Sequence, residues 1–337
     1  MSATKAVRFS VLMPVHNEGN HVGEAIDSVL QQTFSDFELI VIDDGSTDNS
    51  VELIRSYQPR VKLLQQGHEG PEVARNHGAA IAKGEYLVFL DGDDFFFPFA
   101  LATLDRVIRH FDSPPLVLTT VLFFDNGQEV PVPTPDLIEV FKYTNYLSRS
   151  RPAGSATRAA NLTDSIVVKR SVFVEVGGMR NSSPETFYNE DGHLLLKLGT
   201  YSPCVIINQP VTTAYRKHAT NSTGNVVAIA QAWLRIARAE RHGQYHGKNK
   251  WGRYALIGGR SLQWALRYCW PGRQRKLAIQ LLFGTSPMIA VALANQLLRT
   301  FRRMDPPIVL QQVNEIDAIG SESHFRQGLA VDELKKS

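Results

Sequence analysis

Three carboxylates follow an apolar run in YLVFLDGDD, residues 86–94. Asp91, Asp93 and Asp94 lie within four positions, and Gly92 between the first two permits a close approach of the backbone. Carboxylates so close together repel one another and resist burial unless a cation neutralises them. Their hard oxygens suit Mg²⁺ or Mn²⁺, ions that keep water and phosphate oxygens in their coordination shells. The segment therefore predicts a divalent-metal site for a phosphorylated ligand, with a solvated turn as the alternative.

Similar polar segments end two other apolar runs, PVHNE at residues 14–18 and DDGSTD at residues 43–48. A carboxylate at a strand end can accept a hydrogen bond from a base or a ribose, although DDGS is also an ordinary turn signal. The pairs Arg75-Asn76 and Glu190-Asp191 and the segment YRKH at 215–218 are each compatible with surface positions when taken alone. Their meaning depends on whether the fold brings them to one place.

Regular alternation of strand-like and helix-like segments supplies such a place. The predicted strands are 8–15, 37–43, 61–65, 85–91 and 116–124, and the predicted helices are 20–32, 47–57, 71–83 and 98–111. Pro71 and Pro98 are expected at the first position of their helices, and Ser46 to Asp48 should cap another. The pattern predicts an α/β fold with a doubly wound, mainly parallel sheet, in which ligands bind at the carboxyl ends of the strands.

The remainder of the chain is less regular and ends in helices. We expect a hairpin at 125–128, a polar loop at 148–163, strands at 164–168, 203–207 and 211–216, helices at 170–176 and 189–199, and further helices at 226–242, 252–269, 273–283 and 287–303. Residues after Arg303 show no clear apolar period. The predicted division is a catalytic domain at 1–225, a helical region at 226–303 and a loosely ordered tail at 304–337.

Composition excludes some classes of protein. The 337 residues carry a net charge of +3, which is too small to indicate nucleic-acid binding. Two cysteines far apart make a disulfide framework improbable and favour a reducing, cytoplasmic location. No stretch of ~20 apolar residues is present, because Gly284 to Pro287 interrupt the longest candidate.

Taken together, the motifs resemble those of the family 2 glycosyltransferases, which have the GT-A fold. The resemblance covers residues 8–224 and is carried by SVLMPVHNEG, QQTFSDFELIVIDDGSTDNS, ARNHGAAIAKGEYLVFLDGDD, VGGMR, NEDGHLLLKLG and YRKHATNSTG. It implies transfer of a sugar from a UDP-, GDP- or dTDP-linked donor to an acceptor hydroxyl, with inversion at the anomeric carbon. The acceptor class it implies is a glycan or a glycolipid, as in polysaccharide or cell-envelope biosynthesis.

The resemblance also implies roles on the donor side of the site. Asp93 is similar to the family's metal ligand, Asp91 would contact the ribose or assist the metal, and Asp94 would support them. Asp44 is similar to the carboxylate that contacts the base, and Arg75 would reach the phosphates or brace Asp91 and Asp93. The remaining donor residues implied are Pro14, Val15, His16, Asn17, Glu18, Gly92 and Arg216, and the implied metal ligands are Asp93, Asp91 and His218, with Asn221 and Gly224 in a loop after His218.

On the acceptor side, Asp191 is similar to the family's catalytic base, and Glu190 would tune its pKa or hold acceptor hydroxyls. Two departures from the family pattern limit what carries over. His16 replaces the common tyrosine of the first motif, and the segment RNSSPETFYN before Glu190 matches only loosely. Base stacking and acceptor recognition are therefore not implied.

The residues alone also allow other functions. A polyprenyl-phosphate sugar synthase would need less help from a base, and a non-catalytic sugar-nucleotide or glycan-binding protein would bind donor without turnover. A nucleotidyltransferase is disfavoured, because PVHNEGN stands where a Gly-rich, Lys-containing phosphate loop is expected. The helical region 226–303 has two readings: an appendage that packs on the catalytic domain or forms a homodimer, and a peripheral membrane contact through Trp251, Trp264, Trp270 and arginines on apolar faces.

Overall fold

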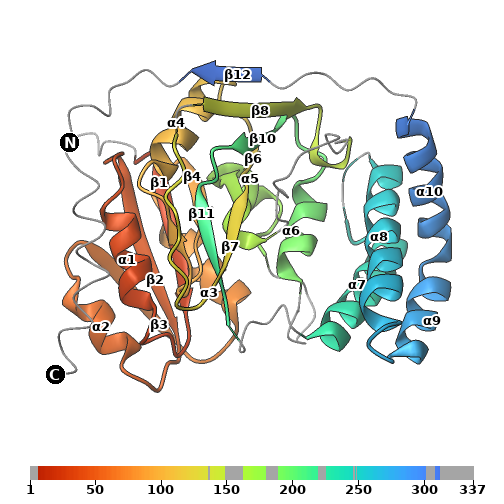
Figure 1. Cartoon of the computed structure of the whole chain (residues 1–337), viewed down its shortest axis with the longest axis horizontal. Coiled ribbons are helices and arrows are strands. Elements are labelled where there is room, and N and C mark those ends of the chain that lie inside the picture. The colour runs from red at the N-terminus through yellow and green to blue at the C-terminus, as the bar shows by residue number, and fades with distance from the viewer. Residues whose placement is uncertain are drawn as a thin grey trace.

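A nine-stranded sheet runs through the molecule in the computed structural model, which describes residues 7–135, 137–148, 162–179, 189–218, 225–245, 247, 249–300 and 308–311. Its strand order is β12-β8-β10-β6-β9-β4-β1-β2-β3 (Figure 1). The strands are β1 (Phe9–Val15), β2 (Phe37–Asp44), β3 (Val61–Gln66), β4 (Tyr86–Phe89), β6 (Leu116–Leu118), β8 (Leu137–Tyr143), β9 (Ile166–Lys169), β10 (Cys204–Gln209) and β12 (Ile308–Gln311). All run in one direction except β8 and β9, so the predicted mainly parallel sheet is confirmed.

Alternation along β1 explains why helices cover both faces of this sheet. Phe9, Val11 and Met13 join one apolar cluster and Leu12 joins the other, and all of them are buried. Helices α1 (Val22–Leu30), α2 (Ser50–Ser56) and α4 (Ala100–His110) contribute to the first cluster or its margin. Helices α3 (Pro71–Ile81), α5 (Arg170–Glu175) and α6 (Glu190–Leu198) contribute to the second. A strand that is buried on both faces reads as a continuous apolar run, as this one does.

Helix starts were predicted with mixed success. Helix α3 begins at Pro71 as expected. The prediction that Pro98 begins a helix was wrong, because α4 starts at Ala100. Helix α2 begins at Ser50 rather than near Thr47, because the Asp48 carboxylate accepts hydrogen bonds from the Ser50 amide and hydroxyl.

A second, three-stranded sheet overturns two predictions. It consists of β5 (Phe95–Phe96), β11 (Thr213–Lys217) and β7 (Val121–Asp125), with β11 in the middle. The single strand predicted at 116–124 is therefore two strands, β6 and β7, which belong to different sheets. The hairpin predicted at 125–128 was wrong as well. The chain turns there, but β7 pairs in parallel with the distant strand β11, with Val121 opposite Thr213. Local turn signals cannot reveal a partner so distant in sequence.

Four helical segments form the C-terminal end of the molecule, as the sequence predicts. They are α7 (Val226–Arg241), α8 (Lys250–Trp264), which continues into a π-helical segment (Ala265–Cys269), α9 (Arg275–Gly284) and α10 (Ser286–Thr300). Their buried side chains, among them Trp233, Ile257 and Leu281, share one apolar cluster with α6 and the sheet. The domain boundary predicted at residue 225 stays a prediction, since the described core continues across it.

Part of the expected loosely ordered tail is a strand. Ile308, Val309 and Leu310 pair antiparallel with β8 and extend the edge of the large sheet. Three apolar residues are too short a run to show a period, and the unpaired edge of β8 decides their conformation. Residues 312–337 and most of the loop predicted at 148–163 lie outside the described residues.

Gly258 permits α8 and α10 to cross closely, and it offers a test of this packing. A Cβ atom at Gly258 would lie 2.1 Å from the Met288 carbonyl oxygen, whereas one at Gly259 would meet Ala292 at 3.9 Å. We expect Gly258→Ala to lower the free energy of unfolding by about 1–3 kcal/mol, because α10 must shift. Gly259→Ala is the matched control and should be neutral or stabilise by about 0.5–1 kcal/mol. Urea denaturation measures both, and equal effects would contradict this account of the crossing.

Candidate functional site at the strand ends

The predicted polar segments meet at the carboxyl ends of β1, β2 and β4. Strand β1 pairs in parallel with both β2 and β4, so residues 14–18, Asp44 and the segment Asp91 to Asp94 emerge at one edge of the sheet. Gly92 is buried there, and a Cβ atom on it would lie 3.0 Å from the Val15 side chain and 3.4 Å from the Pro14 carbonyl oxygen. The glycine therefore lets the aspartate turn pack directly against the end of β1.

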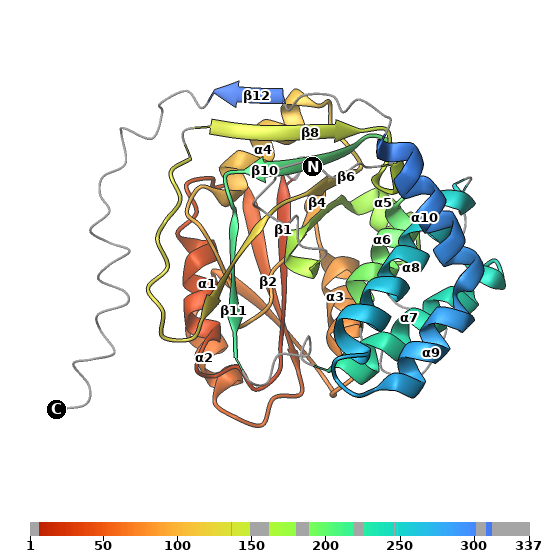
Figure 2. The same ribbon diagram turned by 45° about the vertical axis from the view of Figure 1, so that its right-hand side comes forward.

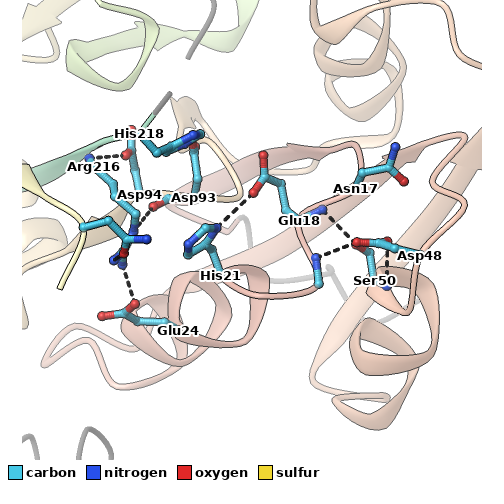
Figure 3. A network of polar contacts seen from close by, with 12 residues as sticks. Asn17, Glu18, His21, Glu24, Asp48, Ser50, Asp93, Asp94, Arg216 and His218 are labelled. Atoms are coloured by element: carbon cyan, nitrogen blue, oxygen red, sulfur yellow. Dashed lines mark hydrogen bonds and ion pairs between the residues drawn. The ribbon is translucent and has the colours of Figure 1, made fainter. Parts of the chain in front are cut away.

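Asp93 belongs to a compact group of two carboxylates and two histidines. Its Oδ2 lies 2.7 Å from His218 Nε2, and the His218 ring stacks on His21 at a centroid distance of 5.7 Å. His21 Nδ1 in turn lies 3.2 Å from the Glu18 carboxylate (Figure 3). Burial raises the pKa of Asp93, with the negative charge of Asp91 adding to the effect. Burial likewise raises the pKa of Glu18, and the charge of Asp93 adds to it. Asp93 and His218, which the resemblance implies as metal ligands, are thus in contact, and His21 is a member that the sequence did not indicate.

Asp94 and Arg216 hold the aspartate turn onto the second sheet. The Asp94 carboxylate accepts a 2.7 Å hydrogen bond from the Arg216 backbone amide. The buried Arg216 guanidinium donates to the Asp93 carbonyl oxygen at 2.9 Å and to Asn126 at 3.0 Å, and it pairs with Glu24 (Figure 3). The sequence assigned Arg216 to the donor and Asp94 to support. In the structure both side chains position the backbone that carries Asp93.

Arg75 supplies the positive charge that the crowded carboxylates require. Its guanidinium is 1% exposed, forms an ion pair with Asp91, and lies 3.6 Å from the Glu190 carboxylate. The charges of Asp91 and Glu190 raise its pKa against the opposing effect of burial. Of the two aspartates that Arg75 was expected to brace, the described contacts include Asp91 and not Asp93. Arg75 also joins the aspartate turn to α6, because Glu190 begins that helix.

Asp164 is a buried carboxyl that the sequence analysis missed. Its Oδ1 accepts a 3.1 Å hydrogen bond from the Asp91 backbone amide, and its carboxyl group bonds that of Asp94. Burial, reinforced by the charge of Asp91, raises the pKa of Asp164 to about 8. Two carboxyl groups in contact must share a proton, so one of this pair is neutral at pH 7. The sequence signal that could have indicated Asp164 is a single aspartate immediately before the apolar run SIVVK.

Asp44 is engaged by its own chain. Its carboxylate accepts hydrogen bonds from Gln66 Nε2 at 2.7 Å and from the amides of Glu69 and Gly70 at 2.8 and 2.9 Å. His16 Nδ1 lies 2.8 Å from the Asp44 carbonyl oxygen, and the His16 ring stacks on His68 at 4.0 Å. His68 is a second residue here that the sequence did not indicate. His16 is the residue that stands where the family pattern has a tyrosine.

Hydrogen bonds of Asn17 and Ser46 join the carboxyl ends of β1 and β2. Asn17 adopts a left-handed conformation with φ of 57°, and its side chain accepts a 2.8 Å hydrogen bond from the Thr47 amide. The Ser46 and Ser50 hydroxyls accept hydrogen bonds from the amides of Asn17 and Glu18, both at 2.9 Å. The turn predicted at DDGS is confirmed, because the Ser46 amide donates to the Asp43 carboxylate at 3.1 Å.

Asp191 has the properties of a proton acceptor near neutral pH. It lies in the first turn of α6, and burial together with the adjacent Glu190 charge raises its pKa to about 7. Arg260 of α8 opposes that shift, so a helix of the C-terminal region contributes to the electrostatics of this carboxylate. Asn189, at the N-cap, has a left-handed backbone with φ of 88°, which is uncommon for a residue other than glycine. Most of RNSSPETFYN, and also Asn221 and Gly224, lie outside the described residues.

Two groups of side chains have ligand atoms close enough to hold a metal. Within the described residues these are Asp91, Asp94 and Asp164, and His16, Asp44 and His68, each with ligand atoms within 4.8 Å of one another. The first group is poorly suited, because Asp94 and Asp164 are buried, share a proton and bind backbone amides. Asp93 is largely buried beside His218, and its pKa is raised first by burial and second by the charge of Asp91. Asp91, Asp93 and His218, which the resemblance implies as the metal ligands, have carboxylate and imidazole donors that suit Mg²⁺ or Mn²⁺. They are not one of the two groups above, so their assignment as ligands stays a prediction.

Comparisons with known proteins agree with this geometry. The family model for Glycosyl transferase family 2 matches residues 10–170. The uncharacterized glycosyltransferase YibD of Escherichia coli (strain K12) is 42% identical over 100 residues, which make up 29% of each chain. Glycosyltransferase GlyG of Streptococcus pneumoniae serotype 4 is 36% identical over 108 residues, 31% of this chain and 36% of that one. The matched segment thus spans about a third of the length of these relatives.

Solved structures resemble a larger part of the chain. S. aureus TarS 1-349 superposes with a TM-score of 0.60 at 16% identity, covering 91% of this chain and 97% of that one. The same fragment in complex with UDP-GlcNAc gives a TM-score of 0.62, also at 16% identity and with the same coverage. At this identity the likeness concerns the fold, and it confirms the expected GT-A-like architecture with its helical C-terminal extension.

The charge balance at Arg75 can be tested by stability. We expect Arg75→Met to lower the free energy of unfolding at pH 8 by about 3–5 kcal/mol, because Asp91 and Glu190 lose their buried counter-charge. The deficit should shrink at pH 5, where carboxyl groups with raised pKa values take up protons more readily. Arg55→Met is the matched control, since Arg55 is exposed on α2, and it should change stability by less than ~0.5 kcal/mol. Equal stability of the two variants at pH 8 would refute the assignment.

Proposed function

We propose, from the premise that residues 10–170 form a glycosyl transferase family 2 domain, that the protein transfers a sugar from a nucleotide-diphosphate donor to an acceptor hydroxyl with inversion at the anomeric carbon. The observation that carries this proposal is the position of Arg75 between Asp91 and Glu190, the residue that precedes Asp191. Asp91 and the neighbouring Asp93 offer a cation site, whereas Asp191 is a raised-pKa carboxylate on α6. Relatives named as glycosyltransferases and a fold neighbour solved with UDP-GlcNAc support a nucleotide-sugar donor.

The donor diphosphate would lie at the aspartate turn. Asp93, Asp91 and His218 would hold a divalent Mg²⁺ or Mn²⁺, which supplies positive charge to the departing diphosphate when bound. Arg75 fixes the orientation of the Asp91 carboxylate, and Arg216 fixes the backbone of Asp93, so the ligands are arranged before the donor arrives. This preorganisation is what makes charge stabilisation effective in an enzyme site.

The nucleoside would lie along the carboxyl ends of β1 and β2. Pro14 to Glu18 line this path, and the stacked His16 and His68 imidazoles offer a flat surface to a base. The Asp44 carboxylate already binds two backbone amides and Gln66, so it would act on the base through the loop that it organises or through its remaining lone pairs. Which base fits is not specified by these contacts, and UDP, GDP and dTDP donors are all included in the proposal.

Asp191 would remove the proton from the acceptor hydroxyl as its oxygen attacks the anomeric carbon. A base with a pKa near the working pH combines a useful ionised fraction with adequate basicity, and such a residue contributes ~10²–10⁴ in rate. Glu190 keeps this pKa raised through its charge while Arg75 and Arg260 limit the shift. The acceptor is proposed to be a glycan or a lipid-linked glycan of the cell envelope, and the cytoplasmic location stays a prediction.

A polyprenyl-phosphate sugar synthase is the second candidate, because a phosphate acceptor needs no base. The raised pKa of Asp191 favours the hydroxyl acceptor, since it describes a group poised to take a proton. A non-catalytic sugar-nucleotide or glycan-binding protein would bind donor and leave it intact. If the wild-type protein turns over its donor and Asp191→Asn abolishes that turnover, the result favours the hydroxyl-acceptor enzyme over both the synthase and the binding protein.

Donor and metal binding are tested by thermal shift. We expect one class among UDP-, GDP- and dTDP-sugars to raise the melting temperature when Mn²⁺ or Mg²⁺ is present, by an amount equivalent to about 2.7 kcal/mol at a hundred times the Kd. Asp93→Ala should abolish the metal-dependent part, because it removes the largely buried carboxylate beside His218. Glu52→Ala, at an exposed carboxylate on α2, is the control and should respond as wild type does. No response to any donor would overturn the proposal.

The role of Asp191 predicts opposite effects on activity and stability. We expect kcat/KM to fall about tenfold per pH unit below pH 7, where the carboxylate takes up a proton, and Asp191→Asn to lose ~10²–10⁴ of the activity. Because its pKa is raised above that of the unfolded chain, the side chain costs stability as the pH rises from about 4 to about 7. Asp191→Asn should therefore have a higher melting temperature than wild type at pH 8 and a similar one at pH 4.

The exposed Glu52→Gln variant is the control for this pair of measurements, and it should change neither profile. A pH-independent kcat/KM between pH 6 and 8, or an Asp191→Asn variant that keeps its activity, would contradict the role of Asp191 as the base.

A further inference from the structure

Large apolar side chains are exposed on the outermost helices of the C-terminal region. Phe283 at the end of α9 is 77% exposed and Leu297 on α10 is 67% exposed. We call the set to which they belong the C-terminal apolar surface, and its members are Leu266, Trp270, Ile279, Phe283, Leu293 and Leu297, all exposed. Figures 1 and 2 both show α9 and α10 at the end of the molecule that lies opposite α2 and β3.

The exposed residues follow helical spacing, so they form faces rather than isolated positions. On α10, Ala290, Leu293, Ala294 and Leu297 are exposed and lie three or four residues apart. On α9, Ile279 and Phe283 are four residues apart. The opposite side of α10 packs on α8, where Met288 is buried against Gly258. Both helices are therefore apolar on the packed side and on the outer side, which a helix surrounded by water would not be.

Cations alone accompany this surface. From Arg241 to Met304, Arg241 included, the sequence has twelve Lys and Arg residues and no Asp or Glu. The cations nearest to the apolar surface along the chain are Arg267, Arg273, Arg275 and Lys276, and all four are exposed. Tryptophan also gathers in this part of the chain, since all four tryptophans lie between Trp233 and Trp270. Exposed tryptophan, arginine and aliphatic side chains together are the composition of helices that lie at a membrane surface.

The shape of α9 and α10 suits a surface contact. In the described part of the chain, no single helix has the length and hydropathy of a membrane span, although Arg275–Gly284 and Ser286–Leu297 reach that composition together across a bend of 74°. Phe283 immediately precedes the bend. The bend is held from inside, because the buried Thr285 hydroxyl donates to the Leu281 carbonyl oxygen at 2.7 Å.

We propose that the C-terminal apolar surface docks on an anionic phospholipid bilayer, with Phe283 at the bend and Leu297 on α10 inserted at the acyl boundary and Arg267, Arg273, Arg275 and Lys276 bound to the headgroups. Charge complementarity selects this occupant over a second copy of the chain. A two-fold contact through the surface would bring cations of both copies together with no nearby acidic residue to neutralise them. The proposal does not depend on the glycosyl transfer, because the residues proposed to hold donor and metal lie on or beside β1, β2, β4 and β11 and not on α9 or α10.

Vesicle binding by the full chain tests the proposal. We expect wild type to cosediment with phosphatidylcholine vesicles that contain 30% phosphatidylglycerol, to bind pure phosphatidylcholine vesicles much more weakly, and to be released in part by 0.5 M NaCl. Because every tryptophan lies at residues 233–270, binding should also shift the intrinsic tryptophan emission to the blue as Trp270 leaves water.

Two variants separate the apolar part from the charged part. Phe283→Asp should weaken binding to the anionic vesicles about tenfold to a hundredfold, since it removes one inserted aromatic side chain and adds a negative charge. A triple variant, Arg273→Gln, Arg275→Gln and Lys276→Gln, should lose the preference for anionic vesicles. Val132→Asp, at an exposed apolar residue of the loop before β8, is the control and should bind as wild type does. Circular dichroism melting confirms that each variant is folded.

Three outcomes would overturn the proposal: no binding of wild type to the anionic vesicles, binding that Phe283→Asp leaves unchanged, and a dimer in lipid-free light scattering that Phe283→Asp dissociates. The last would assign the surface to a second copy of the chain. Metal-dependent donor binding should be the same in Phe283→Asp and wild type, so a failure of the membrane proposal is distinguishable from a failure of the proposed enzymatic activity.

Discussion

The buried Arg75 guanidinium is the interaction on which the candidate site depends. A charge that is 1% exposed is stable only among opposite charges, and Arg75 has Asp91 on one side and Glu190 on the other. These two carboxylates come from the end of β4 and the start of α6, which are separated by almost a hundred residues. One side chain of α3 therefore sets the spacing between the aspartate turn and the acidic pair. The same contact neutralises part of the negative charge that would otherwise oppose folding.

Other carboxyl groups of the site are harder to ionise than they are in water. Asp93, Glu18, Asp164 and Asp191 all have raised pKa values, and burial is the first cause in each case. Such groups cost folding stability, because water stabilises an ionised carboxylate better than a protein interior does. Binding of a cation or a proton at these groups would relieve that cost. The apolar packing beneath it, including Phe95, Phe97 and Phe99, supplies the compensating stability.

Strand β11 and helix α8, which lie outside the matched residues 10–170, also contribute to the site. Strand β11 brings Arg216 and His218 to the aspartate turn, and α8 brings Arg260 into the electrostatic environment of Asp191. The C-terminal helices thus have two chemically different sides. The inner side shares an apolar cluster with α6 and the sheet, whereas the outer side is apolar and basic.

The sequence by itself determined the α/β alternation, the mainly parallel sheet, and the candidate residues at strand ends such as Asp44, Asp91 and Asp93. These follow from local periodicity and from the rule that parallel strands place their carboxyl ends together. Only the tertiary structure decided that Asp164 contacts Asp94, that His68 stacks on His16, that Arg75 braces Asp91 rather than Asp93, and that residues 116–124 divide between two sheets. Contacts of this kind join residues far apart in the chain, and their geometry depends on how helices and strands pack. Side-chain type and local spacing carry no record of that packing.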